Sequence, residues 1–172
     1  MAEENTRDTS QDNPQNQPMF NIEKVYLKDM SFESPQSPSV FTQEAQPHGD
    51  VNLEVRHTVL DEEKGFYEVV LFMRVQAKEK EHTWFLVELE QAGVFLVRNV
   101  PDGELPKLLE IACPNILLPY AREAISDLTI KGGFPPMMIQ PVNFEAMYFQ
   151  KLQAAKSGGA ENSDDSAEKV KH

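Results

Sequence analysis

Apolar and polar residues alternate along several stretches before residue 100, and this alternation is the pattern of half-buried β-strands. The clearest case is residues 51–60, VNLEVRHTVL, which place on one face Val51, Leu53, Val55, His57 and Val59. Residues 20–28 show the same alternation with a phase slip between Ile22 and Val25. Such a slip predicts a strand that carries a β-bulge.

Two further strands carry bulky apolar side chains on both faces. Residues 66–77 place Val69, Leu71, Met73 and Val75 on one face and Phe66, Val70 and Phe72 on the other, and residues 83–95 behave similarly. Two helices of modest length cover only one sheet face, so a monomer would leave an apolar patch exposed. The pattern therefore predicts a protein interface or a ligand groove, and twofold self-association would bury the same patch on each copy.

The apolar spacing changes to a helical period after residue 103. Residues 104–112 predict a short helix. A main helix is expected to follow, with Asn115 as its N-cap and with Gly132 and Gly133 as its stop. Its apolar stripe consists of Leu117, Ala121, Ala124, Ile125 and Leu128. The prolines at its start, including Pro119, are expected to mark the helix entrance. A final helix begins near Asn143. Strands followed by helices predict an α+β fold: a four-stranded antiparallel sheet with C-terminal helices on one face.

Both ends of the chain differ from the middle. Residues 1–18 and 156–172 are polar and poor in large apolar side chains, so we expect both to be disordered tails. The tails serve either a specific role or solubility alone. Residues 19–155 between them are expected to form one domain. No apolar run is long enough to cross a membrane and no signal sequence is present, which predicts a cytoplasmic protein without membrane insertion.

The chain is strongly acidic, with 28 acidic and 16 basic residues and a formal net charge of −12. Binding to phosphate backbones needs clustered Lys and Arg, so nucleic acid and anionic membranes are not expected as partners. The charge favours a basic protein partner, although solubility alone is an equally simple explanation.

Candidate catalytic and metal-binding patterns are weak. Cys113 is the single cysteine, which excludes an internal disulfide, and no metal-ligand spacing surrounds it among His48, His57, His82 and His172. Arg122 and Glu123 suit a solvated or interfacial salt bridge better than acid–base chemistry. We found no Gly-rich phosphate loop and no serine elbow, so the chain is not expected to be an enzyme or to hold a cofactor or metal.

Two proline-rich segments interrupt the regular pattern. Residues 33–50 are expected to cross the surface as an extended loop that carries Val40 and Phe41, and residues 134–144, FPPMMIQPVNF, combine aromatic residues with adjacent methionines. Such side chains on irregular backbone suit a surface that accepts many apolar partners. The alternative is that they only close the core around the helix connection.

Three blocks, KDMSFESPQSP, CPNILLPYARE and PVNFEAMY, together with FLVELEQAGVF between them, resemble the signatures of the SecB family of export chaperones. The resemblance covers about Phe20 to Leu152. It implies subunits that assemble as a dimer of dimers, a homotetramer. It also implies a holdase that uses no nucleotide, keeps precursor proteins unfolded in the cytoplasm and delivers them to the SecA translocation ATPase.

The resemblance also implies site residues. Contact with SecA would fall on the outer sheet face, at Asp29, Glu33, Leu86 and Glu88. Positions that influence assembly and client binding would be Phe85, Val87, Leu89 and Gln91. The main helix would help to build the contact between dimers through Tyr120, Ala124 and Leu128.

The client groove is expected between the long loop and the helical side, with walls made of Phe32, Phe41, Phe134, Phe144 and Met147. Relatives often carry a tryptophan where this chain has Ala45, which puts the aromatic lining on that side in doubt. The competing hypothesis is an oligomeric adaptor that binds one specific folded partner and no unfolded chains.

Overall fold

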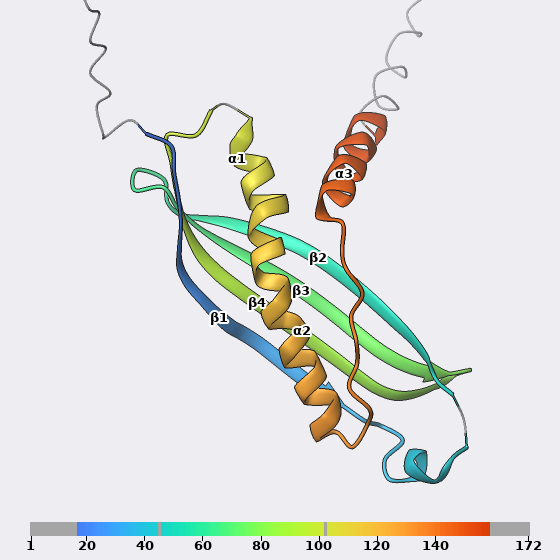
Figure 1. The fold of residues 1–172 in the computed structure, drawn as a ribbon. Coiled ribbons are helices and arrows are strands. Elements are labelled where there is room, and N and C mark those ends of the chain that lie inside the picture. The colour runs from blue at the N-terminus through green and yellow to red at the C-terminus, as the bar shows by residue number, and fades with distance from the viewer. Residues whose placement is uncertain (1–16, 45, 102, 159–172) are drawn as a thin grey trace, which may run out of the picture.

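The computed structural model describes residues 17–44, 46–101 and 103–158. Four strands form a single antiparallel sheet in the order β1-β4-β3-β2, as Figure 1 shows. Their bounds are β1 (Met19–Glu33), β2 (His48–Asp61), β3 (Phe66–Glu79) and β4 (His82–Arg98). The predicted fold class is confirmed.

Strand β1 carries the predicted bulge and a second one. Its register against β4 shifts between Ile22 and Lys24 and again between Leu27 and Asp29. Next to the second shift, the buried side chain of Gln91 donates a hydrogen bond of 2.8 Å from Nε2 to the carbonyl oxygen of Tyr26. A buried amide needs such a partner, and this bond ties the irregular part of β1 to the centre of the sheet.

The predicted helix boundary at Asn115 is wrong. Helix α1 (Glu104–Lys107), a π-helical turn (Leu108–Ala112) and α2 (Cys113–Lys131) follow one another without a break. Asn115 lies inside this run, and its Nδ2 donates to the carbonyl oxygen of Ile111 at 2.8 Å. Pro114 and Pro119 are therefore interior residues and do not mark an entrance. The wider π turn ends at Ala112, two residues before Pro114, where the chain lacks a backbone N–H for an α-helical bond.

Helix α2 ends at the predicted glycines. The N–H groups of Gly132 and Gly133 bond to the carbonyls of Leu128 and Ile130, at 2.8 and 3.0 Å, and Gly133 adopts a φ of 85°. Positive φ is a conformation that glycine adopts without steric cost, so the chain can reverse here.

Beyond this turn, residues 134–143 run back beside α2 to α3 (Phe144–Gly158) (Figure 1). Helix α3 begins near Asn143 as predicted, and Asn143 caps it, because its Oδ1 accepts a bond of 2.9 Å from the N–H of Ala146. Helix α3 continues three residues beyond the predicted domain end at 155.

The core lies between α2 and one face of the sheet (Figure 1). Side chains of β3 and β4 that alternate toward the helix are almost fully buried: Val69, Leu71, Met73, Val75, Phe85, Val87, Leu89 and Phe95. Helix α2 covers them with Leu117, Ala121 and Ile125, each with an exposure of 0%. The predicted apolar stripe is confirmed at these three positions, whereas Ala124 and Leu128 are only partly buried at its edge.

Exposed apolar surface lies on the edge strands, not on both faces of β3 and β4 as the sequence predicted. A helix about 10 Å wide spans two strands spaced about 4.8 Å apart, so α2 cannot cover the whole sheet. On the helix side of β1, the exposed residues are Ile22, Leu27 and Met30, and on β2 they are Val51 and Val59. On the open face, long polar side chains cover the apolar residues of β3, as Arg56 does over the ring of Phe72.

The segment predicted as an extended loop over 33–50 is shorter and more compact. Strand β1 includes Glu33 and β2 begins at His48, and a 3₁₀ turn (Ser39–Thr42) lies between them and buries Val40. Ala45 and most of both predicted tails, residues 1–16 and 159–172, lie outside the described residues.

Candidate functional site

Four phenylalanines meet where α2, β1, β4 and the 3₁₀ turn come together. Ring centroids of Phe134 lie 4.9 Å from Phe85, 5.2 Å from Phe41 and 6.3 Å from Phe32. Phe134 is buried, but 52% of Phe41 is exposed, so one side of the group faces solvent. We call these four residues the aromatic cluster.

An apolar groove follows strand β2 away from the aromatic cluster. It consists of two adjoining hollows that share Leu53. Strand β2 forms one wall, and the other wall is made by Met137, Met138, Ile139, Pro141, Val142, Phe144 and Met147. We call this the edge groove. Phe144 and Met147 belong to it, so the five predicted client residues divide between the aromatic cluster and the edge groove.

The methionine segment is held at one point by Thr129 of α2. The buried Thr129 hydroxyl donates to the carbonyl of Ser126 at 2.9 Å and accepts a bond of 3.1 Å from the N–H of Met137. Met137 then rests on Gly49, where an added Cβ would lie 2.8 Å from its Cε. The next side chain, Met138, is 75% exposed. The backbone of the groove wall is therefore fixed while its methionines remain available for contact.

Glu110 connects three elements at the far end of the edge groove. Its Oε1 lies 2.8 Å from Nζ of Lys151 on α3 and 3.4 Å from Nδ1 of His57 on β2. Glu110 itself lies on the π-helical turn, with a side chain only 11% exposed. Since Lys151 lies one helical turn after Met147, this carboxylate holds α3 over the groove.

The four residues that the resemblance assigns to SecA contact all lie on the open face of the sheet. Glu33 pairs with Leu86 across β1 and β4, Ser31 pairs with Glu88, and Asp29 pairs with Glu90. Because paired residues point to the same side, these side chains share one face with Leu86 among the carboxylates. Their role in contact stays a prediction.

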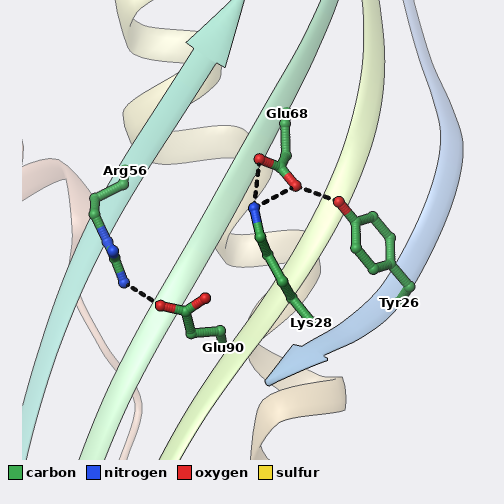
Figure 2. A network of polar contacts seen from close by, with 5 residues as sticks. All are labelled: Tyr26, Lys28, Arg56, Glu68 and Glu90. Carbon is green, nitrogen blue, oxygen red and sulfur yellow. Dashed lines mark hydrogen bonds and ion pairs between the residues drawn. The ribbon is translucent and has the colours of Figure 1, made fainter. Parts of the chain in front are cut away.

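Ion pairs cross this open face in rows, and Figure 2 shows two of them on the side of the sheet away from the helices. Arg56 of β2 reaches over to Glu90 of β4 at 2.7 Å. Glu68 of β3 binds Lys28 at 2.8 Å and accepts a hydrogen bond from the Tyr26 hydroxyl.

This network shifts two pKa values in opposite directions. Bonding to Lys28, reinforced by the Tyr26 hydroxyl, lowers the pKa of Glu68. Burial of the phenol, with the neighbouring carboxylate adding to the effect, raises the pKa of Tyr26 to about 12. Near neutral pH the pair is therefore a carboxylate and a neutral phenol.

The residues expected to influence assembly have two different locations. The side chains of Phe85, Val87, Leu89 and Gln91 are buried under α2, so they can influence a contact between subunits only through the core. On α2, Tyr120 is 52% exposed, and Ala124 and Leu128 lie beside it at helical spacing. On the opposite flank, Nε and one terminal nitrogen of Arg122 are buried without a hydrogen-bond partner. The salt bridge expected for Arg122 is not formed within the described chain.

The structure adds residues that sequence reasoning missed. Glu110, Lys151 and His57 come together only in three dimensions, and no spacing along the chain connects them. Arg56 and Arg74 could have been suspected, because each alternates onto the open face of the sheet, the face that carries the acidic positions of β4.

Cys113 is a free and buried thiol. Its side chain is fully buried, and burial raises its pKa to about 12. No group of three or more potential metal ligands occurs within the described ranges. In the same part of the chain, no helix is long and apolar enough to cross a membrane.

An apolar groove at a sheet edge together with an acidic open face suits a protein that binds other polypeptides. Comparison with known proteins agrees. The family model described as preprotein translocase subunit SecB matches residues 13–155. Protein-export protein SecB of Chromobacterium violaceum is 49% identical over 145 residues, which cover 84% of this chain and 95% of the relative. Its counterpart from Dechloromonas aromatica is also 49% identical over 145 residues, with 84% and 94% covered.

A solved structure shares the fold. The SecB-like chaperone Rv1957 of Mycobacterium tuberculosis, in complex with a ChAD peptide from the HigA1 antitoxin, superposes with a TM-score of 0.60 at 18% identity. The match covers 72% of this chain and 90% of that one. From the family model and the curated relatives, the chain belongs to the SecB family of protein-export chaperones.

Proposed function

We propose that this chaperone holds unfolded precursor proteins in the cytoplasm without ATP, delivers them to SecA and works as a tetramer. The observation that carries the client role is the edge groove, which ends near the partly open aromatic cluster. An extended client segment placed there would bury apolar surface at roughly 25 cal/mol per Å². Because ordering the client costs entropy, many weak contacts over several subunits are needed.

The client role is tested by refolding. A denatured precursor diluted into a severalfold excess of this protein, without ATP, is expected to refold much more slowly than alone. Replacing Met138 by Ser removes an exposed groove contact that the core does not use, and should weaken the delay. Normal refolding kinetics in the presence of the unmodified protein would count against a holdase.

An adaptor for one folded partner remains the second candidate. The solved relative from Mycobacterium tuberculosis is in complex with a ChAD peptide from one antitoxin, and a preference for a single partner is the feature of that complex that an adaptor would share. Competition distinguishes the two: several unrelated unfolded polypeptides displace a bound client from a holdase, whereas an adaptor responds to one partner alone.

For SecA, we propose a contact on the open face around Asp29, Glu33, Leu86 and Glu88. Carboxylates around a partly buried leucine would attract a basic element at long range and give it a small apolar anchor. Replacing Glu88 by Lys should weaken SecA binding and leave binding of unfolded clients nearly intact. Equal loss of both would indicate a misplaced site or a damaged fold.

For assembly, we propose that further copies cover the helix side of β1 and the exposed flank of α2. Ile22, Leu27 and Met30 form an exposed apolar row on that side of β1. In this proposal Phe85, Val87, Leu89 and Gln91 support the contact through the core, and Tyr120, Ala124 and Leu128 make it directly. Mass measurement in solution tests it, and a monomer at micromolar concentration would overturn it.

A further inference from the structure

The acidic residues of β4 on the open face are already occupied. Glu88 and Glu90 lie two positions apart on the same face, which separates them by about 7 Å. Arg74 of β3 is the register partner of Glu88, and its Nη1 lies 3.3 Å from Oε1 of Glu88. Arg56 of β2 passes over Phe72, at 5.4 Å from the ring centroid, and reaches Glu90 at 2.7 Å.

These two ion pairs differ in how firmly they are held. The side chains of Arg74 and Glu88 are 48% and 40% exposed, and no other bond of Arg74 is found in the described part of the chain. Exposed pairs of this kind are weak because water competes for both partners. Arg56 has a shorter bond, a less exposed carboxylate and the face of an aromatic ring beneath it, all of which strengthen its contact. Arg74 is therefore the cation that a competitor displaces more easily.

Neighbouring carboxylates on β1 have no such cation. Asp29 and Glu33 make no ion pair within the described residues, and the one side-chain bond of Asp29 is accepted from the N–H of Met30. A basic segment that approaches the open face would thus meet unpaired charge on β1 and paired charge on β4.

We propose that Arg74 is an internal competitor of the basic partner segment, occupying Glu88 in the free chaperone and giving it up when the partner binds. This inference rests on the proposed contact between SecA and the open face. It also defines the partner's chemistry: two cationic side chains about 7 Å apart, as found two residues apart in a strand. One takes over Glu88, and the other meets Asp29, which is the diagonal neighbour of Glu88 across β1 and β4. Arg74 then acts through Glu88 and lowers affinity for any basic segment that cannot replace it.

The test measures binding to purified SecA over a range of salt concentrations. Replacing Arg74 by Gln is expected to tighten binding about threefold to tenfold at low salt, and the gain should disappear at high salt because the freed charge is screened. In a Glu88→Gln background the same substitution should have no effect, since the two residues act as a pair. Thermal unfolding of each variant verifies that the fold is retained.

The matched control is Lys107→Gln, which removes the same charge by breaking an exposed ion pair with Glu104 on α1. Its effect on SecA binding should stay within about twofold, as expected for a charge distant from the contact. The competitor role is overturned if Arg74→Gln does not tighten binding, tightens it no more than Lys107→Gln does, or tightens it equally without Glu88. If Glu88→Lys leaves SecA binding unchanged, the proposed contact itself is wrong. If only Glu88→Lys has an effect, the contact stands and the competitor role alone fails.

Discussion

The ring of Phe32 on β1 occupies the space that a side chain at Gly132 would need at the end of α2. Gly132 has a φ of −72°, an ordinary helical value, so it is required for this close approach and not for its backbone conformation. Strand β1, the end of α2 and the aromatic cluster are therefore fitted to one another at a single contact.

Replacing Gly132 by Ala is expected to lower the free energy of unfolding by about 1–3 kcal/mol, because Phe32 must leave a packed position. Denaturant unfolding measures the loss. In a Phe32→Leu background the additional cost of Gly132→Ala should shrink, since the smaller side chain leaves room. A cost that is the same in both backgrounds would contradict the steric explanation.

Replacing Glu110 by Gln is expected to loosen α3. The substitution removes the charge that attracts both Lys151 and His57, so amide hydrogens in the second half of α3 should exchange about two to ten times faster. Exchange mass spectrometry reports this directly. Glu145→Gln is the control, because this exposed residue lies on α3 and makes no ion pair within the described chain. Unchanged protection after Glu110→Gln would show that apolar contacts alone hold the helix.

Tyr26 is expected to link stability to alkaline pH. Its folded pKa of about 12 lies above the ordinary value of 10.0, so its contribution is complete below about pH 10 and is lost as the pH rises toward 12. Difference absorbance between the unmodified protein and Tyr26→Phe isolates this phenol from the other tyrosines. In Glu68→Gln the titration should move down only part of the way, since burial is the larger cause. A titration near 10 in the unmodified protein would contradict the buried network.

Cys113 should resist alkylation in the native protein. The thiolate is the reactive form, and a pKa of about 12 leaves very little of it near neutral pH. We expect modification to be at least about 100-fold slower than in the denatured chain. Mass spectrometry over time measures both rates. Similar rates would mean that the helical run opens readily around this residue.

The positions of the strands were predictable because the alternation of apolar and polar side chains repeats every two residues and depends only on neighbouring positions in the sequence. The alternation around Val69 to Val75 and the slip after Ile22 both appear in the sheet at the expected places. The long loop was assigned too many residues, since its ends are polar enough to look irregular although they pair as edge strands. Polar edge positions carry little signal in a sequence, because only one of their faces is in contact with the core.

Helix boundaries were less predictable for a different reason. Pro114 and Asn115 carry the usual signals of a helix start, yet packing of Leu109, Cys113 and Leu117 on the sheet keeps the run continuous and a π turn accommodates the proline. Tertiary burial outweighed the local preference.

The candidate site was predictable in composition but not in arrangement. The five client residues were chosen from two separate segments, and the structure divides them between the aromatic cluster and the edge groove. Glu110 could not be found beforehand, because its partners are distant along the chain. Contacts between charges on different elements depend on the packed fold, which no local pattern encodes.

The uninterrupted helical run also sets the distance between the far end of the groove and the aromatic cluster. From Glu110 at one end of the groove to Gly132 beside the phenylalanines, it measures about 33 Å at a rise of about 1.5 Å per residue. A fully stretched polypeptide needs about ten residues to cover that distance. Tightly folded proteins rarely present so long an extended segment, so in the proposed client role a site of this length would favour chains that have not finished folding.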